Sequence, residues 1–197
     1  MTVSCDIFGA MRPAQGETVC GDAYWVVRGR VSTIALADGL GHGHGAAEAA
    51  SVFIDFFTRN AAEPLDKILS SSTGPMSKTR GAVGALTRID HERHTLEFCG
   101  VGNIEIKARS HAAINAFCMP GIIGRPVRRL NIFSFEVHPG DVLAVYSDGI
   151  SSRFDLSDYT DIAPEGLAER ILTDHGKNHD DATCVVLEVR SDDSAKR

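Results

Sequence analysis

The stretch VSTIALADGLGHGHGAAEAASVF, residues 31–53, carries three structural signals in succession. Its first part, residues 31–37, is mostly apolar or β-branched, which predicts a buried strand. A glycine-rich loop follows and begins with Asp38-Gly39. From Ala46 to residue 60, apolar side chains recur at helical spacing, which predicts an amphipathic helix. This order of elements indicates a helix that packs on a sheet.

Short runs of strand-forming residues, bounded by Gly, Pro, Asn or Asp, recur along the chain. One lies at residues 24–27, and the following Arg28-Gly29-Arg30 predicts a tight hairpin with the run at 31–37. Later runs lie at residues 81–89, 95–99, 104–108, 132–137, 142–146 and 183–189, and further helices are expected at residues 64–69 and 164–172. This order predicts an α+β fold, an α/β/β/α sandwich of two antiparallel β-sheets flanked by helices.

Length and composition limit the classes of protein to which the chain can belong. With 197 residues and 43% hydrophobic content, we expect a single domain over residues 1–190 and a disordered tail over residues 191–197. The formal charge of −6 and the scattered Lys and Arg argue against nucleic-acid binding. No apolar stretch approaches the roughly 20 residues that span a bilayer, and the N-terminus lacks the pattern of a signal peptide. We therefore expect a cytoplasmic protein that does not contact membranes.

Several conspicuous residues are expected to be structural. The five cysteines show no CxxC spacing, which predicts reduced thiols, with Cys99 and Cys184 in the core. Trp25 is expected to be a core residue as well. Asp141 follows Pro139-Gly140, so it is expected to be a turn residue rather than a ligand.

Aspartates stand at the ends of three of the predicted strands. Asp38-Gly39 and Asp148-Gly149 each follow an apolar run, and Asp180-Asp181 precedes another. In an antiparallel sheet the end of one strand lies beside the start of its neighbour, so these acids could meet at one sheet edge.

The predicted hairpin adds a fourth acidic position. A turn centred on Gly29 places Asp22 roughly opposite Leu36 and therefore within reach of Asp38. Converging carboxylates repel one another strongly unless cations bind among them. Oxygen ligands suit Mg²⁺ or Mn²⁺, so the pattern predicts a metal centre. The alternative, that the Asp-Gly pairs are ordinary turn signals, explains each pair alone but not their repetition next to apolar runs.

The glycine-rich loop, residues 38–45, offers backbone N–H groups and the positive end of a helix dipole beside these acids. A phosphate group could be steered there. His42 is a candidate proton donor to a leaving group, the alternatives being a metal ligand or a solvated loop residue. His44 is expected to be a solvated loop residue.

Five segments in combination resemble the PP2C-type (PPM) metal-dependent protein phosphatases, in the bacterial branch typified by the stage II sporulation phosphatase. They are Gly21-Asp22-Ala23-Tyr24, Asp38-Gly39-Leu40-Gly41-His42-Gly43, Gly140-Asp141-Val142-Leu143, Ser147-Asp148-Gly149-Ile150 and Asp180-Asp181-Ala182-Thr183. They occur in the order of the family and span almost the whole chain. The short length is most similar to that of the stand-alone RsbX-type phosphatases of stressosomes.

The resemblance implies a phosphoserine/phosphothreonine protein phosphatase that uses Mn²⁺ or Mg²⁺, two ions in all, and a metal-activated water. In the family pattern Asp38 bridges both ions, Gly39 contributes a carbonyl, and Asp148 and Asp180 complete the shell of one ion. Asp22 would support the second ion, and Asp181, beside Asp180, is a further candidate ligand. The resemblance also implies STAS-domain stressosome proteins as substrates, and hence the resetting of a bacterial stress-signalling complex.

The chain departs from the larger eukaryotic members in the residues that would bind phosphate. Those members carry an acidic residue at the position of Gly21 and an Arg shortly upstream, whereas the nearest residues here are Glu17 and Arg12. One alternative function is a catalytically inactive PP2C-fold module that binds phosphoproteins, although the three intact family aspartates argue against it. Another is a two-metal hydrolase of small phosphoesters or nucleic acids, and the acidic charge argues against a nuclease.

Overall fold

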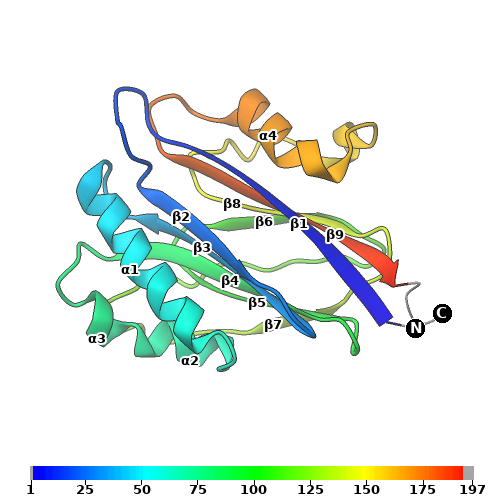
Figure 1. Cartoon of the computed structure of the whole chain (residues 1–197), viewed down its shortest axis with the longest axis horizontal. Helices are drawn as coiled ribbons and strands as arrows, with labels where there is room; N and C mark the ends of the chain where they lie inside the picture. Colours follow the sequence, from blue (N-terminus) through cyan, green and yellow to red (C-terminus); the bar gives the residue numbers. More distant parts are fainter. Residues whose placement is uncertain (1, 193–197) are drawn as a thin grey trace.

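A computed structural model describes residues 2–192 as two stacked sheets covered by helices (Figure 1). The strands are β1 (Thr2–Arg12), β2 (Asp22–Val27), β3 (Val31–Gly39), β4 (Ala82–Asp90), β5 (Thr95–Val101), β6 (Glu105–Arg109), β7 (Phe133–Glu136), β8 (Val142–Tyr146) and β9 (Ala182–Asp192). The helices are α1 (His44–Asn60), α2 (Leu65–Ser71), α3 (Thr73–Met76) and α4 (Pro164–His175), with a 3₁₀ helix η1 at Leu156–Tyr159. Within these described residues, no helix is both long enough and apolar enough to cross a bilayer.

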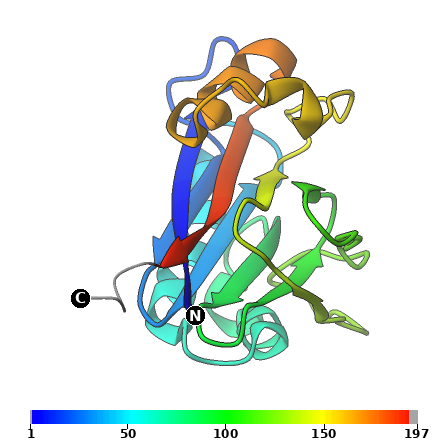
Figure 2. The same cartoon turned by 90° about the vertical axis from the view of Figure 1, so that its right-hand side faces the viewer.

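All strand pairs are antiparallel. One sheet has the order β1-β9-β8-β6 and the other has the order β2-β3-β4-β5-β7. Figure 2 shows α4 on the outer side of the four-stranded sheet and α1 to α3 on the far side of the five-stranded sheet. The predicted α/β/β/α sandwich is confirmed.

Three apolar clusters hold these layers together. Leu36, Phe98 and Val145 belong to the cluster between the two sheets. A second cluster joins α1 and α2 to the five-stranded sheet, and a third joins α4 to the four-stranded sheet. The buried side chains of α1 are the ones that helical spacing predicts, namely Ala46, Ala49, Ala50, Phe53 and Phe57.

β1 is a strand that the sequence pattern did not predict. Its 11 residues pair with β9 along their whole length, from Thr2 opposite Asp192 to Arg12 opposite Ala182. The segment contains Asp6 and Gly9, types that are depleted in strands, so tertiary pairing rather than local preference fixes it. Because β9 reaches Asp192, the predicted tail begins too early; its remaining residues, 193–197, lie outside the described part of the chain.

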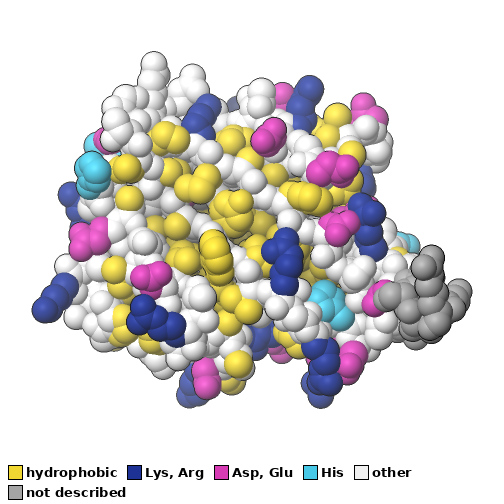
Figure 3. Space-filling view, in the orientation of Figure 1, with side chains coloured by type: hydrophobic (Ala, Val, Ile, Leu, Met, Phe, Trp, Pro, Cys, Tyr) yellow, Lys and Arg dark blue, Asp and Glu magenta, His cyan; other side chains and the backbone are white. Residues whose placement is uncertain are grey.

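The cysteines agree with their expected structural role, whereas Trp25 does not. Cys99 and Cys184 are fully buried, and this burial raises the pKa of each thiol to about 12. Trp25 is 53% exposed, because β2 is an edge strand of its sheet and has a neighbouring strand on one side only. Figure 3 shows apolar side chains gathered across the middle of this face of the molecule.

Asp141 is the turn residue that the sequence predicts. It is 1% exposed, and its Oδ1 accepts hydrogen bonds from the backbone N–H and the Nδ1 of His111, at 2.8 and 2.7 Å. Its Oδ2 accepts a hydrogen bond from the backbone N–H of His138, at 2.8 Å. One buried carboxylate thus joins the segment after β6 to the turn before β8.

We expect Asp141→Ala to lower the free energy of unfolding by roughly 2–4 kcal/mol, because two backbone N–H groups lose their acceptor. Urea denaturation measures this change. Asp55→Ala, on the exposed face of α1, is the matched control and should change stability by less than about 0.5 kcal/mol. Equal effects of the two substitutions would contradict the structural role of Asp141.

Candidate metal centre

The five-stranded sheet contributes two aspartates to one end of the sandwich. Asp22 starts β2 and lies directly opposite Asp38, near the end of β3. The register differs from the predicted one, because Tyr24 rather than Asp22 pairs with Leu36. The predicted hairpin was therefore displaced by two residues, and the actual register brings Asp22 and Asp38 closer than expected.

The four-stranded sheet contributes three more aspartates. β8 ends immediately before Ser147-Asp148, and β9 starts immediately after Asp180-Asp181. The two strands are antiparallel neighbours, and the backbone N–H of Ser147 donates to the carbonyl of Thr183 at 3.0 Å. The prediction that all the acids meet at one sheet edge is wrong, because they come from two stacked sheets.

A hydrogen bond between the sheets joins these two sets of acids. The hydroxyl of Ser147 donates to Asp22 Oδ2 at 2.7 Å and accepts the backbone N–H of Thr183 at 3.0 Å. Asp22 is 2% exposed, so this neutral donor satisfies one oxygen of a buried carboxylate. Ser147 belongs to one of the five family segments, but the sequence around it does not indicate a contact with Asp22.

Other polar groups position the remaining acids. Asn103 Nδ2 donates to Asp148 Oδ2 at 2.7 Å, and the backbone N–H of Ala14 donates to Asp181 Oδ1 at 3.0 Å. Lys177 Nζ donates to the backbone carbonyl of Asp148. Asn103 and Lys177 were not predicted from the sequence, because each lies in a connection far along the chain from the acid that it contacts.

Burial and mutual repulsion perturb the acids. Burial first, and then the charges of the other four aspartates, raise the pKa of Asp38 to about 8. Burial likewise raises the pKa of Asp22 to about 7, with the hydroxyl of Ser147 opposing the change and the charges of Asp181 and Asp148 adding to it. The pKa of Asp148 is also raised, chiefly by burial and then by Asp180. The five carboxyl groups therefore form one electrostatic cluster.

Glycines allow the backbone to approach closely at this end of the sandwich. A Cβ at Gly39 would lie 2.0 Å from the carbonyl oxygen of Ala46 in α1. A Cβ at Gly149 would lie 1.9 Å from the carbonyl oxygen of Asp181. The glycine that follows each aspartate is therefore required where α1 packs on β3 and where β8 ends beside β9.

The donor atoms of the cluster fit a hard divalent cation. Asp22 Oδ1 and Asp181 Oδ2 are buried and lack a hydrogen bond of normal geometry, so each has a free acceptor. Within residues 2–192, no three side chains of His, Cys, Asp or Glu are already arranged to hold an ion by themselves. Mg²⁺ usually keeps several waters and uses only one or two carboxylates, so such an arrangement is not required.

The glycine-rich loop lies beside the cluster and places its histidines in different surroundings. His42 Nδ1 lies 2.5 Å from Glu17 Oε1, in the loop between β1 and β2, at the upper left of Figure 1. His44 is exposed and starts α1. Arg12, the upstream arginine, instead donates through Nη2 to the carbonyl of Lys177 at 3.0 Å.

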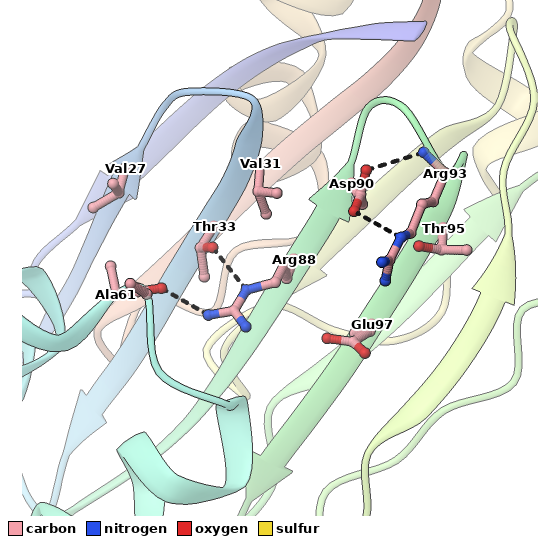
Figure 4. A pocket seen from close by; sticks show the side chains of 10 residues that line it. Val27, Val31, Thr33, Ala61, Arg88, Asp90, Arg93, Thr95 and Glu97 are labelled. Carbon is pink, nitrogen blue, oxygen red and sulfur yellow. Dashed lines mark hydrogen bonds and ion pairs between the residues drawn. The ribbon is translucent and has the colours of Figure 1, made fainter. Parts of the chain in front are cut away.

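A pocket of about 460 Å³ lies away from the acids, at the opposite end of β3 (Figure 4). Arg88 enters this pocket and donates to the carbonyls of Ala61 and Glu63, which fixes the segment after α1. Arg93 and Glu97 also line it, so positive and negative groups are both present. These contacts indicate a structural role for Arg88.

Comparisons with known proteins identify the family. The family described as Stage II sporulation protein E (SpoIIE) matches residues 28–190, which is most of the chain. The chain belongs to the SpoIIE family. The resemblance found from the five sequence segments is confirmed.

Relatives of this SpoIIE-family chain include a named phosphatase. This chain is 24% identical over 140 residues to the phosphoserine phosphatase RsbX of Bacillus subtilis (strain 168), and the match covers 70% of each chain. A solved structure described as "The bacterial stressosome: a modular system that has been adapted to control secondary messenger signaling" is 31% identical. It has a TM-score of 0.89 and covers 94% of this chain and 100% of that one. RsbX in complex with magnesium is 20% identical, with a TM-score of 0.83, and covers 94% of this chain and 95% of that one, so it shares the fold.

The raised pKa of Asp38 predicts a pH-dependent stability in the absence of metal. The unfolded chain ionises this group near its ordinary pKa of 3.8, whereas the folded chain resists ionisation up to about pH 8. Stability from this group is therefore complete below pH 3.8 and is lost as the pH rises through 8.

We expect Asp38→Asn to unfold at higher urea than the wild type at pH 8 in EDTA, with a gain of at least about 1 kcal/mol. The gain should shrink towards pH 4, where both states of the wild type hold the proton. Asp55→Asn serves as the control. A variant that is less stable than the wild type at pH 8 would show that Asp38 is not strained.

Proposed function

We propose that this protein is a metal-dependent phosphatase that removes phosphate from phosphoserine or phosphothreonine of a partner protein. The observation that carries the proposal is the convergence of five aspartates from two sheets, with two buried carboxylate oxygens that lack a hydrogen bond of normal geometry. Membership of the SpoIIE family and the likeness to the phosphoserine phosphatase RsbX support it.

The ligands that we propose are oxygen atoms of the cluster. Asp38, Asp148 and Asp180 would hold the metal, with the carbonyl of Gly39, while Asp22 and Asp181 would complete the site. Two Mn²⁺ or Mg²⁺ ions are proposed, and magnesium is bound by the structurally similar RsbX. When bound, such ions supply an activated water and neutralise the charge of the phosphoryl oxygens.

The protein itself positions these ligands. Ser147 fixes the orientation of Asp22, and Asn103 fixes that of Asp148. His42 is the proposed proton donor to the leaving group, and its contact with Glu17 would orient the imidazole. Removal of the Glu17 side chain should therefore also disturb the orientation of His42.

The partner that we propose is a phosphorylated STAS-domain protein of a bacterial stressosome, and the compartment is the cytoplasm. The support comes from two relatives: the named phosphatase RsbX and the solved structure described as belonging to the bacterial stressosome. Dephosphorylation of such a partner would reset a stress-signalling complex.

Phosphate release from a phosphoserine protein tests the reaction. Metal-stripped wild type should be inactive, and Mn²⁺ should restore activity. Asp38→Asn should lower kcat by roughly 10²- to 10⁴-fold with Mn²⁺ present, because loss of metal ligation removes several kcal/mol of transition-state stabilisation. Asp55→Asn, which changes the same chemical group on the exposed face of α1, should keep wild-type activity.

Two results would oppose this proposal. Activity that survives in EDTA would exclude the metal mechanism. Binding of the phosphoprotein without phosphate release, at any Mn²⁺ or Mg²⁺ concentration, would favour the catalytically inactive binding module.

Metal binding should also be visible as a gain in stability. Mn²⁺ at about 100 times its Kd should stabilise the wild type by about 2.7 kcal/mol, because it binds the folded state. The shift in Tm should be largely lost in Asp38→Asn and retained in Asp141→Asn, which alters a buried aspartate outside the cluster. An equal shift in both variants would place the metal elsewhere.

A further inference from the structure

Arg80 lies next to the glycine-rich loop, although none of the five family segments contains it. The segment before β4 continues beside the end of β3, where the backbone N–H of Leu40 donates to the carbonyl of Gly81 at 3.0 Å. Gly39 pairs with Ala82 at the start of β4, so Arg80, two residues before Ala82, lies alongside the loop. The sheet register, rather than proximity in sequence, brings this arginine beside the glycine-rich loop that follows Asp38.

The Arg80 guanidinium lies against two glycines of the loop. A Cβ at Gly45 would lie 2.6 Å from Cζ and from Nε of Arg80, and a Cβ at Gly41 would lie 3.1 Å from Nη1. Any side chain at position 45 would displace the guanidinium. The glycines therefore leave the space that Arg80 occupies.

Arg80 has no partner that explains this position. Within residues 2–192 its exposed side chain makes no ion pair and no hydrogen bond. Glu17, the carboxylate nearest to Gly43, is already paired with His42. Arg80 also lies at the first turn of α1, which contains no acidic residue. A cation at the positive end of a helix dipole is unfavourable by itself, so the position is explained if an anion binds there.

Arg12 is not available for the same role. It donates to the carbonyl of Lys177, and its Nη2 lies 3.1 Å from the position of a Cβ at Gly176. Lys177 in turn donates to the backbone of Asp148. Both cations are engaged in holding the connection before β9.

We propose that Arg80 binds the phosphoryl group of the substrate, as the residue that orients a phosphomonoester dianion over the aspartate cluster. This inference rests on the proposed phosphatase function. A guanidinium offers two parallel N–H groups to two phosphate oxygens, which fixes orientation as well as charge. Carboxylates repel a phosphate dianion, so a cation beside the loop that follows Asp38 would also raise the affinity for substrate.

The test compares four full-length proteins loaded with Mn²⁺: wild type, Arg80→Gln, Arg80→Lys and Lys78→Gln. Lys78 is exposed in the same segment, so Lys78→Gln removes the same charge from a position two residues away. The measurements are kcat/KM on a phosphoserine protein, the Kd of inorganic phosphate by calorimetry, and the shift in Tm with Mn²⁺.

We expect Arg80→Gln to lower kcat/KM and to raise the Kd of phosphate, each by roughly 10- to 100-fold. Its Tm shift with Mn²⁺ should equal that of the wild type, which separates phosphate binding from metal binding and from loop stability. Arg80→Lys should recover part of the loss, because it keeps the charge but not the paired donors. Lys78→Gln should stay within about twofold of the wild type, because salt screens the charge of an exposed side chain that does not contact the phosphate.

The outcomes are distinguishable from failure of the proposed function. An active wild type with an equally active Arg80→Gln, and equal Kd values for phosphate, would overturn the role of Arg80 and leave the phosphatase intact. A wild type that releases no phosphate would refute the phosphatase, and the calorimetric Kd values would still decide whether Arg80 binds phosphate. If Arg80→Gln does not fold, the same measurements on Arg80→Lys decide whether Arg80 binds phosphate.

Discussion

Five carboxyl groups share the end of the sandwich where the two sheets meet, and their mutual repulsion is the constraint on which the site depends. The chain reduces this cost with neutral donors: the hydroxyl of Ser147, the amide of Asn103 and a backbone N–H. Within the described residues, none of the five aspartates forms an ion pair with Lys or Arg. Lys177, which donates to the backbone of Asp148, is the cation whose charge opposes the repulsion at that residue. Most of the negative charge is therefore held in place by neutral donors, which leaves it available to a divalent cation.

Asp141 and Asp22 show how differently one fold treats two buried aspartates. Asp141 receives three hydrogen bonds on its two oxygens and connects two segments of backbone. Asp22 receives one hydrogen bond on Oδ2, while its Oδ1 is buried without a partner. A carboxylate with all its acceptors used is a structural element, whereas one with an unused buried acceptor has capacity left for a ligand. This difference is visible only in the folded chain, because both residues stand next to glycine at the border of a strand.

Local sequence patterns predicted the features of the fold that depend on neighbouring residues. The alternation of apolar runs and turn residues located most strands, and the spacing of Ala46, Phe53 and Phe57 located the buried face of α1. The family segments contain all five aspartates that the structure brings together. β1 escaped prediction because its partner is at the far end of the sequence, and the hairpin register could not be fixed without knowing which residues form the turn. Asn103 and Lys177 were missed for the same reason, since their contacts with Asp148 exist only through the pairing of the strands.

The pairing of β1 with β9 has a consequence for the way the protein is made. The first strand emerges from the ribosome long before residue 192, the last residue of its partner, has been synthesised. Until then β1 has no partner strand on either side, and unpaired strand edges can pair with other chains. Asp180 and Asp181 stand at the entrance to β9, so the strand that closes this sheet also delivers the last acids to the cluster. A nascent chain therefore has no complete centre before β9 has been synthesised, and the pairing of β9 with β1 and β8 assembles the site.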